Sequence, residues 1–176
     1  MQDLTIPGRA CGACTLCCKV MEVTDLAKPR GVWCENCKPG VGCNIYAQRP
    51  RECATFLCGY LTNADLGEEW KPDKCRIILS RDMEGKRLVA NVDPQRPDAW
   101  RKEPYYSKLK QWARTAARNR NLVVVTIGWR MIVVFPDRDV DLGMMSEDEH
   151  VITRQQATPN GVRWEAFKAR KDDPRA

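Results

Sequence analysis

Histidine is almost missing from this chain, which has one, His150, among 176 residues. A metal site built from several imidazoles is therefore excluded, and a histidine-based catalytic triad would depend on that single residue. Because His150 directly follows three acidic residues, a surface position beside them is the favoured interpretation. The sequence also lacks the motifs of a nucleophile elbow, a phosphate-binding loop and a dinucleotide-binding glycine loop.

Long apolar runs are missing too. The longest, from Leu122 to Phe135, contains Arg130 and is shorter than the roughly 20 apolar residues that a helix needs to span a bilayer. The first residues, MQDLTIPGRACG, lack the basic and apolar regions of a secretory signal. We therefore expect a cytoplasmic protein with no membrane partner, in a compartment that keeps thiols reduced.

The two parts of the chain differ in composition. Residues 1–75 hold all ten cysteines, nine basic and nine acidic residues, whereas residues 76–176 carry the whole net charge of +6. The first part is rich in turn formers and poorer in large apolar residues, so burial alone offsets little of its chain entropy. We expect a cysteine-rich metal-binding module at 1–75 with an α+β half at 76–176 packed on it, or both as one continuous domain.

The predicted fold class is α+β, with a loop-rich, cysteine-dense N-terminal metal module followed by a small strand–helix–β-hairpin half. Short β-branched runs predict strands, and apolar residues spaced by three and four positions after Pro104 predict a helix. The expected elements are strands at 75–80 and 87–93, a helix from Pro104 to about Asn119, a hairpin of 122–127 with 131–135, and short elements near 151–153 and 162–167.

The cysteine spacing points to metal binding. A CxxC step lets two thiolates meet at one ion, and four thiolates at about 2.3 Å complete the tetrahedron of zinc. Ten cysteines exceed the needs of one such site, and the side chains of adjacent Cys17 and Cys18 point in different directions. The doublet therefore indicates two neighbouring centres, or one centre with an additional free thiol. A set of unliganded, buried or redox-active cysteines is the less favoured alternative.

Zinc is the expected metal, and an iron–sulfur centre is the alternative. Soft thiolate sites suit both, and CxxCxxC supplies three of the four ligands in many [4Fe-4S] proteins. The proline that often follows the last ligand in bacterial ferredoxins is missing, because Lys19 follows Cys18. In the alternative, the protein would serve electron transfer or an oxidoreductase system, together with a redox partner protein.

Several motifs occur in an order that resembles a known family. They are CxxCxxCC at 11–18, Trp33-Cys34, the CxIY step at 43–46 and the RPxxC step at 49–53. Over about residues 9–60 the chain resembles the YkgJ-like CxxCxxCC family of proposed zinc- or iron-chelating proteins, some of which are labelled Fe–S oxidoreductases. The resemblance implies thiolate binding of a metal or cluster. The implied ligands are Cys11, Cys14, Cys17, Cys18, Cys34, Cys43, Cys53 and Cys75, with Cys37 and Cys58 as less certain additions.

A basic stripe on the predicted helix suggests a further, weaker alternative. Lys110, Arg114 and Arg118 recur every four residues and so share one helix face. Together with Arg101 they would suit a phosphate backbone, which would make the chain a zinc-stabilised nucleic-acid-binding protein. A solvated helix face is the favoured interpretation, because one helix without interleaved aromatic residues is weak evidence.

Six acids and one base occupy residues 137–149. The segment is similar to a calcium loop, but Leu142 stands where that loop requires glycine, so calcium binding is rejected. We expect these acids to pair with the basic helix, inside the chain or across a dimer.

Overall fold

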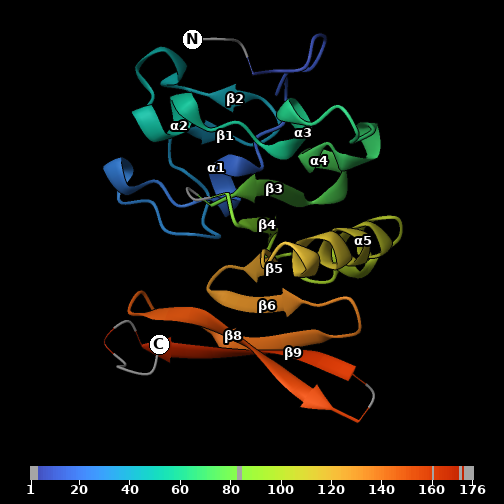
Figure 1. Cartoon of the computed structure of the whole chain (residues 1–176). Helices are drawn as coiled ribbons and strands as arrows, with labels where there is room; N and C mark the ends of the chain where they lie inside the picture. The colour runs from blue at the N-terminus through green and yellow to red at the C-terminus, as the bar shows by residue number, and fades with distance from the viewer. Residues whose placement is uncertain (1–3, 83–84, 160, 171, 173–176) are drawn as a thin grey trace.

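The computed structural model describes residues 4–82, 85–159, 161–170 and 172. It confirms the α+β class, with a cysteine-rich module at one end, a five-stranded sheet in the middle and a long hairpin at the other end (Figure 1). The helices are α1 (Cys17–Val20), α2 (Arg51–Thr55), α3 (Gly59–Thr62), α4 (Pro72–Cys75) and α5 (Tyr105–Arg118), with 3-10 turns η1 (Thr24–Leu26), η2 (Tyr46–Gln48), η3 (Glu68–Trp70) and η4 (Ala99–Arg101). The strands are β1 (Cys37–Lys38), β2 (Gly42–Cys43), β3 (Ile77–Arg81), β4 (Arg87–Val92), β5 (Leu122–Ile127), β6 (Arg130–Val134), β7 (Asp139–Met144), β8 (Glu149–Thr158) and β9 (Gly161–Arg170).

The central sheet has the order β3-β4-β5-β6-β7. Strands β4 and β5 run parallel with α5 in the connection between them, and the other neighbours are antiparallel. The run of valines in β5 is continuous because both faces of this strand are covered. Val123 and Val125 lie in the larger core with Leu109 of α5. Val124 lies in the smaller core with Ala166 of β9.

The predicted strands and helix of the second half are confirmed to within a few residues as β3, β4, α5, β5 and β6. The short elements expected near 151–153 and 162–167 are parts of the two ten-residue strands of the β8–β9 hairpin. The middle residues of β8 are polar and exposed, and they do not show the alternation that marks a half-buried strand.

The acidic segment forms β7, which the sequence did not predict as a strand. Asp139 accepts hydrogen bonds from Lys110 Nζ at 2.7 Å and from the Tyr106 hydroxyl at 3.1 Å, and Arg101 lies 3.3 Å away. Among the described residues, the expected pairing of the acids with the basic helix is confirmed for Asp139 alone, since Asp137 pairs with Arg138 and Asp141 with Arg130. The contacts of Asp139 also place Lys110, an expected member of the basic stripe, in a mostly buried ion pair.

The cysteine-rich module and the sheet share one hydrophobic core. Leu16 and Leu61 of the module belong to the same buried cluster as Ile77 and Ala90 of the sheet. The module's own helices have four or five residues each, and α5 has fourteen. Helices this short have little stability of their own, so the shape of the module depends on what its side chains contact.

A buried ion pair joins the module to the end of β4. Lys19 of α1 is 3% exposed, and its Nζ lies 2.5 Å from Asp93 Oδ1 and 2.8 Å from Gln95 Oε1. The Trp33 ring covers the same ammonium at 5.6 Å. A charge this deeply buried needs its partner to remain ionised, so the pair fixes where α1 sits on the sheet.

Replacing Asp93 with Asn leaves the Lys19 ammonium buried without its counter-charge. We expect Asp93→Asn to lower the free energy of unfolding by about 3–5 kcal/mol, the usual cost of removing one partner of a buried pair. Glu22→Gln, which removes a half-exposed pair with Arg30, serves as the control and costs about 1 kcal/mol or less. Urea unfolding followed by tryptophan fluorescence measures both variants. Equal losses would contradict the role assigned to the Lys19–Asp93 pair.

Candidate metal centre

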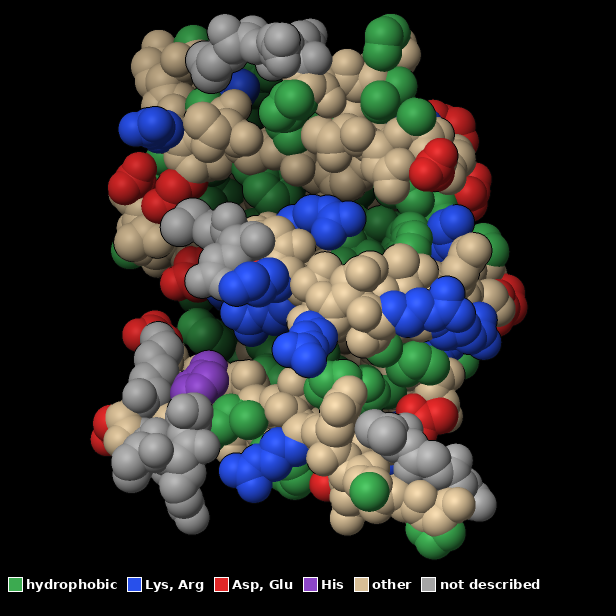
Figure 2. Space-filling view, viewed as in Figure 1, with side chains coloured by type: hydrophobic (Ala, Val, Ile, Leu, Met, Phe, Trp, Pro, Cys, Tyr) green, Lys and Arg blue, Asp and Glu red, His purple; other side chains and the backbone are tan. Residues whose placement is uncertain are grey.

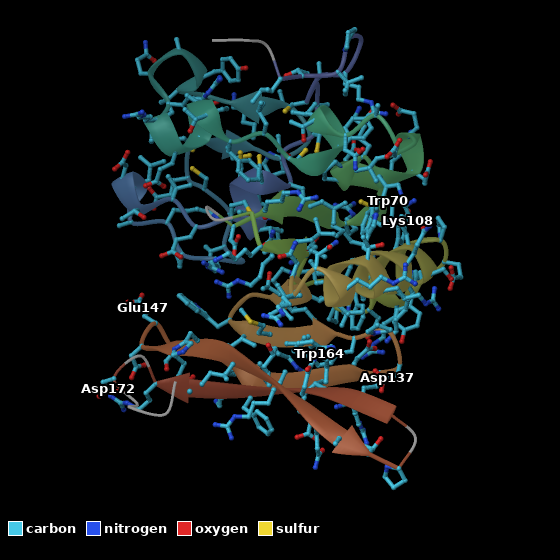
Figure 3. All side chains as sticks on the ribbon, in the orientation of Figure 1. Trp70, Lys108, Asp137, Glu147, Trp164 and Asp172 are labelled. Atoms are coloured by element: carbon cyan, nitrogen blue, oxygen red, sulfur yellow. The ribbon has the colours of Figure 1, made fainter. Side chains whose placement is uncertain are left out.

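The cysteines lie in turns and short helices whose backbone hydrogen bonds bring distant segments together. The amide of Cys34 donates to the carbonyl oxygen of Cys18 at 2.9 Å, and the amide of Cys37 donates to that of Cys34 at 3.0 Å. Cys37 of β1 is the cross-strand partner of Cys43 in β2. Sulfur atoms, yellow in Figure 3, gather among these short elements. We define the first thiol group as Cys17, Cys18, Cys34, Cys37, Cys43 and Cys53.

Charge effects between the sulfur atoms connect the members of this group. The pKa of Cys18 is raised first by a hydrogen bond with the Cys17 thiol and then by burial. Burial, followed by the charge of Cys18, raises the pKa of Cys37 to about 12. The pKa of Cys53 is raised by burial and then by the charges of three thiols, among them Cys34. Burial and mutual repulsion of the thiolates raise the pKa values of these thiols, and a bound cation would lower them again.

The other four cysteines form the second thiol group, Cys11, Cys14, Cys58 and Cys75. Burial, with smaller contributions from the charges of Cys14 and Cys58, raises the pKa of Cys75 to about 12. The pKa of Cys58 is also raised by burial first, and the charges of Cys11 and Cys14 contribute to the increase. Cys75 is 2% exposed, and its Sγ lies 3.2 Å from the carbonyl oxygen of Ile77. This second group is the more deeply buried of the two at its Cys58–Cys75 side.

Arg9 holds the N-terminal loop of the second thiol group in place. Its guanidinium donates to the carbonyl oxygens of Tyr60 at 2.6 Å and Asn63 at 2.7 Å, and it lies over the Tyr60 ring. These bonds tie the loop that carries Cys11 to α3, next to Cys58. The two groups are also neighbours, since the charge of Cys18 raises the pKa of Cys11 after burial, the largest cause.

Lys28 is a buried cation that the sequence did not single out. It is 6% exposed, and its Nζ donates to the carbonyl oxygens of Lys19, at 2.9 Å, and Met21. Burial lowers its pKa, and the charges of four thiols of the first group, Cys34 first, oppose that decrease. Among the described residues, no carboxylate forms an ion pair with Lys28. The thiols are therefore the anions available to it, a relationship that no sequence spacing reveals.

The thiols of each group lie in the same region of the module, but their sulfur atoms do not surround a common centre. In the described ranges, no three or more Cys, His, Asp or Glu side chains are arranged as a group that could hold a metal ion. All ten cysteines are free thiols. Binding an ion would require the thiols of a group to turn toward a common centre and lose their protons.

The two thiol groups together contain all ten cysteines that the sequence offered as ligands. Cys37 and Cys58, the less certain additions, lie in the first and second group respectively, so position does not set them apart from the other eight. The ligand list itself stays a prediction. His150, expected at the surface, is half-buried in β8, and within the described chain its Nδ1 has no hydrogen-bond partner.

Comparisons of the chain with protein-family models, with curated proteins and with solved structures give no match. The resemblance to the YkgJ-like family therefore rests on the motifs alone. No helix in the described part of the chain is long and apolar enough to cross a membrane.

The proposed nucleic-acid contacts are weakened by the fold. The exposed Arg101 and the mostly buried Lys110 both pair with Asp139, whereas Arg114 and Arg118 lie exposed on α5. Two exposed arginines on one helix suit a solvated face better than a phosphate-binding surface.

Burial in the protein core protects the Cys75 thiol from alkylating reagents, with or without a bound metal ion. Since the thiolate is the reactive form, we expect iodoacetamide at pH 8 to modify Cys75 on the order of 100-fold or more slowly in the native protein than in urea. Where a metal ion holds the half-exposed Cys34 and Cys43, a chelator should speed the modification of these two thiols and leave that of Cys75 slow. Peptide mass spectrometry follows each site. Modification of Cys75 together with Cys34 after chelation would contradict this assignment.

Proposed function

We propose that the chain binds zinc through the thiolates of its cysteine-rich module, with one centre in each thiol group. Ten reduced cysteines, no disulfide among the described residues and a single distant histidine make the donor set all sulfur. Sulfur-only sets with four ligands suit zinc. The first group would supply its ligands from Cys17, Cys18, Cys34, Cys37, Cys43 and Cys53, and the second from Cys11, Cys14, Cys58 and Cys75.

The observation that carries this proposal is the buried Lys28 ammonium. A buried cation without an anion is strongly unfavourable, and no described carboxylate pairs with Lys28. Four thiolates and one zinc ion have a formal charge of about −2, which supplies the missing counter-charge. Neutral, unliganded thiols would not supply it.

Zinc in these groups would act as a structural cross-link, because it adds no redox chemistry of its own. Each ion would connect segments that the backbone joins only through loops, and structural zinc contributes roughly 10–16 kcal/mol in small zinc-finger peptides. The protein's own residues position the sulfur atoms. A hydrogen bond from Arg9 to Tyr60 holds the loop of Cys11, and a turn from Cys34 to Cys37 places those two thiols. Reduced thiols require a reducing compartment, which favours the cytoplasm.

A [4Fe-4S] cluster is the second candidate. It is favoured by the spacing of Cys11, Cys14 and Cys17, which is typical of three cluster ligands. Such a cluster would carry one electron at a time to or from a redox partner protein. Against it, Cys17 shares a hydrogen bond with Cys18 of the first group, whereas the charges of Cys11 and Cys14 act on Cys58 of the second. The charge of Cys18 also acts on Cys11, which is a link between the groups that favours the cluster.

Paired cysteine variants test the two-centre proposal. We expect protein purified without oxygen to be colourless and to contain two zinc ions per chain by elemental analysis, whereas absorption near about 400 nm would indicate the cluster. Cys34→Ser and Cys14→Ser should each lower the zinc content by one ion, because each removes a ligand from a different group. The double variant should then retain none. A single variant that loses both ions, or neither, would count against separate centres.

Lys28 variants test the charge argument. We expect Lys28→Met to weaken zinc binding by the first group about tenfold, or roughly 1.4 kcal/mol, whereas Lys28→Arg retains the charge and most of the affinity. Competition with a chromophoric chelator measures both. In metal-free protein Lys28→Met should be at least as stable as the parent, since it removes an uncompensated buried charge. Unchanged zinc affinity in Lys28→Met would show that the ammonium does not face a charged centre.

A further inference from the structure

Two hollows flank the C-terminal half of α5, and the larger of them is lined in part by Leu57 and Gly59, which flank Cys58. The larger, of about 500 Å³, lies between α5 and β3, and the smaller, of about 350 Å³, lies between α5 and the β8–β9 hairpin. Four residues line both hollows, so the two adjoin each other, and we call the pair the α5 groove. The shared residues are Ala116, Asn121, Leu122 and Val123.

The smaller hollow lies between small side chains of α5 on one side and the β8–β9 hairpin on the other. Trp164 of β9 is paired with Gln155 of β8, and both line the hollow from the inner face of the hairpin. Figure 3 shows Trp164 between the central sheet and the hairpin. The Arg138 guanidinium donates to the Trp164 carbonyl oxygen and so holds the hairpin in place. The side of α5 that faces the hollow carries three alanines, Ala113, Ala116 and Ala117.

The groove combines positive charge with aromatic walls. Arg120 lines the smaller hollow, and Arg81 and Lys86 line the larger. Neither hollow has an acidic residue among the described residues that line it. Figure 2 shows the Lys and Arg side chains gathered in a band across the middle of the molecule. Phe135 and Trp164 add flat apolar surface to the smaller hollow.

We propose that the α5 groove binds a nucleotide, with its base beneath Trp164 and its phosphate at Arg120, toward Arg81. A heterocyclic base suits a slot between an aromatic roof and an alanine floor, because stacking is favourable on a flat ring. Arginine without competing carboxylates suits phosphate. The amides of Asn121 and Gln155 match the polar edge of a base, whereas an acyl chain would leave them without partners. The volumes lie in the range of small-ligand sites.

Adenosine 5′-monophosphate is the probe, because it chelates zinc weakly and so does not report on the cysteine module. Titration calorimetry on the full, zinc-containing chain should give a dissociation constant between about 10 µM and 1 mM. Adenosine, which lacks the phosphate, and inorganic phosphate, which lacks the base, should each bind at least about tenfold more weakly. Phosphate binding as tight as that of the nucleotide, or no nucleotide binding, would overturn the proposal.

Three variants locate the binding. Ala116→Leu fills the shared part of the groove, and Arg120→Gln removes the charge at its mouth; each should weaken nucleotide binding at least about tenfold. Arg154→Gln is the matched control, because Arg154 is exposed and neighbours Gln155 along β8, so it projects from the outer face of the hairpin. Circular dichroism checks that each variant is folded. If Ala116→Leu is unfolded, Arg120→Gln, at an exposed position, still tests the site. Equal weakening in Arg154→Gln would show non-specific attraction and overturn the site.

Discussion

Two lysine ammonium groups are buried where the cysteine-rich module meets the sheet, and each requires a negative partner. Asp93 supplies the partner of Lys19 at 2.5 Å. Lys28 has no such carboxylate among the described residues, and the charges of four thiols of the first group act on its pKa. The module is made of short helices and turns that have little stability of their own. Its arrangement therefore depends on how these two charges are neutralised, by a carboxylate in one case and, in our proposal, by a metal–thiolate centre in the other.

Much of the second half could be predicted from sequence, because its elements follow simple periodicities. The valine run of β5 and the apolar face of α5 are visible without coordinates. Strand β7 and the full length of β8 could not be predicted in this way, since β7 is acidic and the middle of β8 is polar and exposed. Pairing with a neighbouring strand, which the local sequence does not encode, holds these residues in extended form.

The candidate site was predictable in its residue types and only partly in its arrangement. Dense cysteines and the Cys17–Cys18 doublet predict two neighbouring centres, or one centre with an additional free thiol, and this stays a prediction. Cys58 is placed near Cys11 by the hydrogen bonds from Arg9 to the α3 region, which connect residues more than fifty positions apart in the sequence. The role of Lys28 depends on burial, and no spacing rule predicts that a lysine is buried. Distance along the chain says little about which sulfur atoms meet, so the grouping required the fold.

X-ray absorption at the zinc edge, on protein purified without oxygen, shows which atoms surround the metal. We predict a single shell of four sulfur neighbours per zinc at about 2.3 Å, with two zinc ions per chain, one for each thiol group. Zinc surrounded by oxygen or nitrogen neighbours, or protein that folds fully and binds no metal, would contradict this prediction.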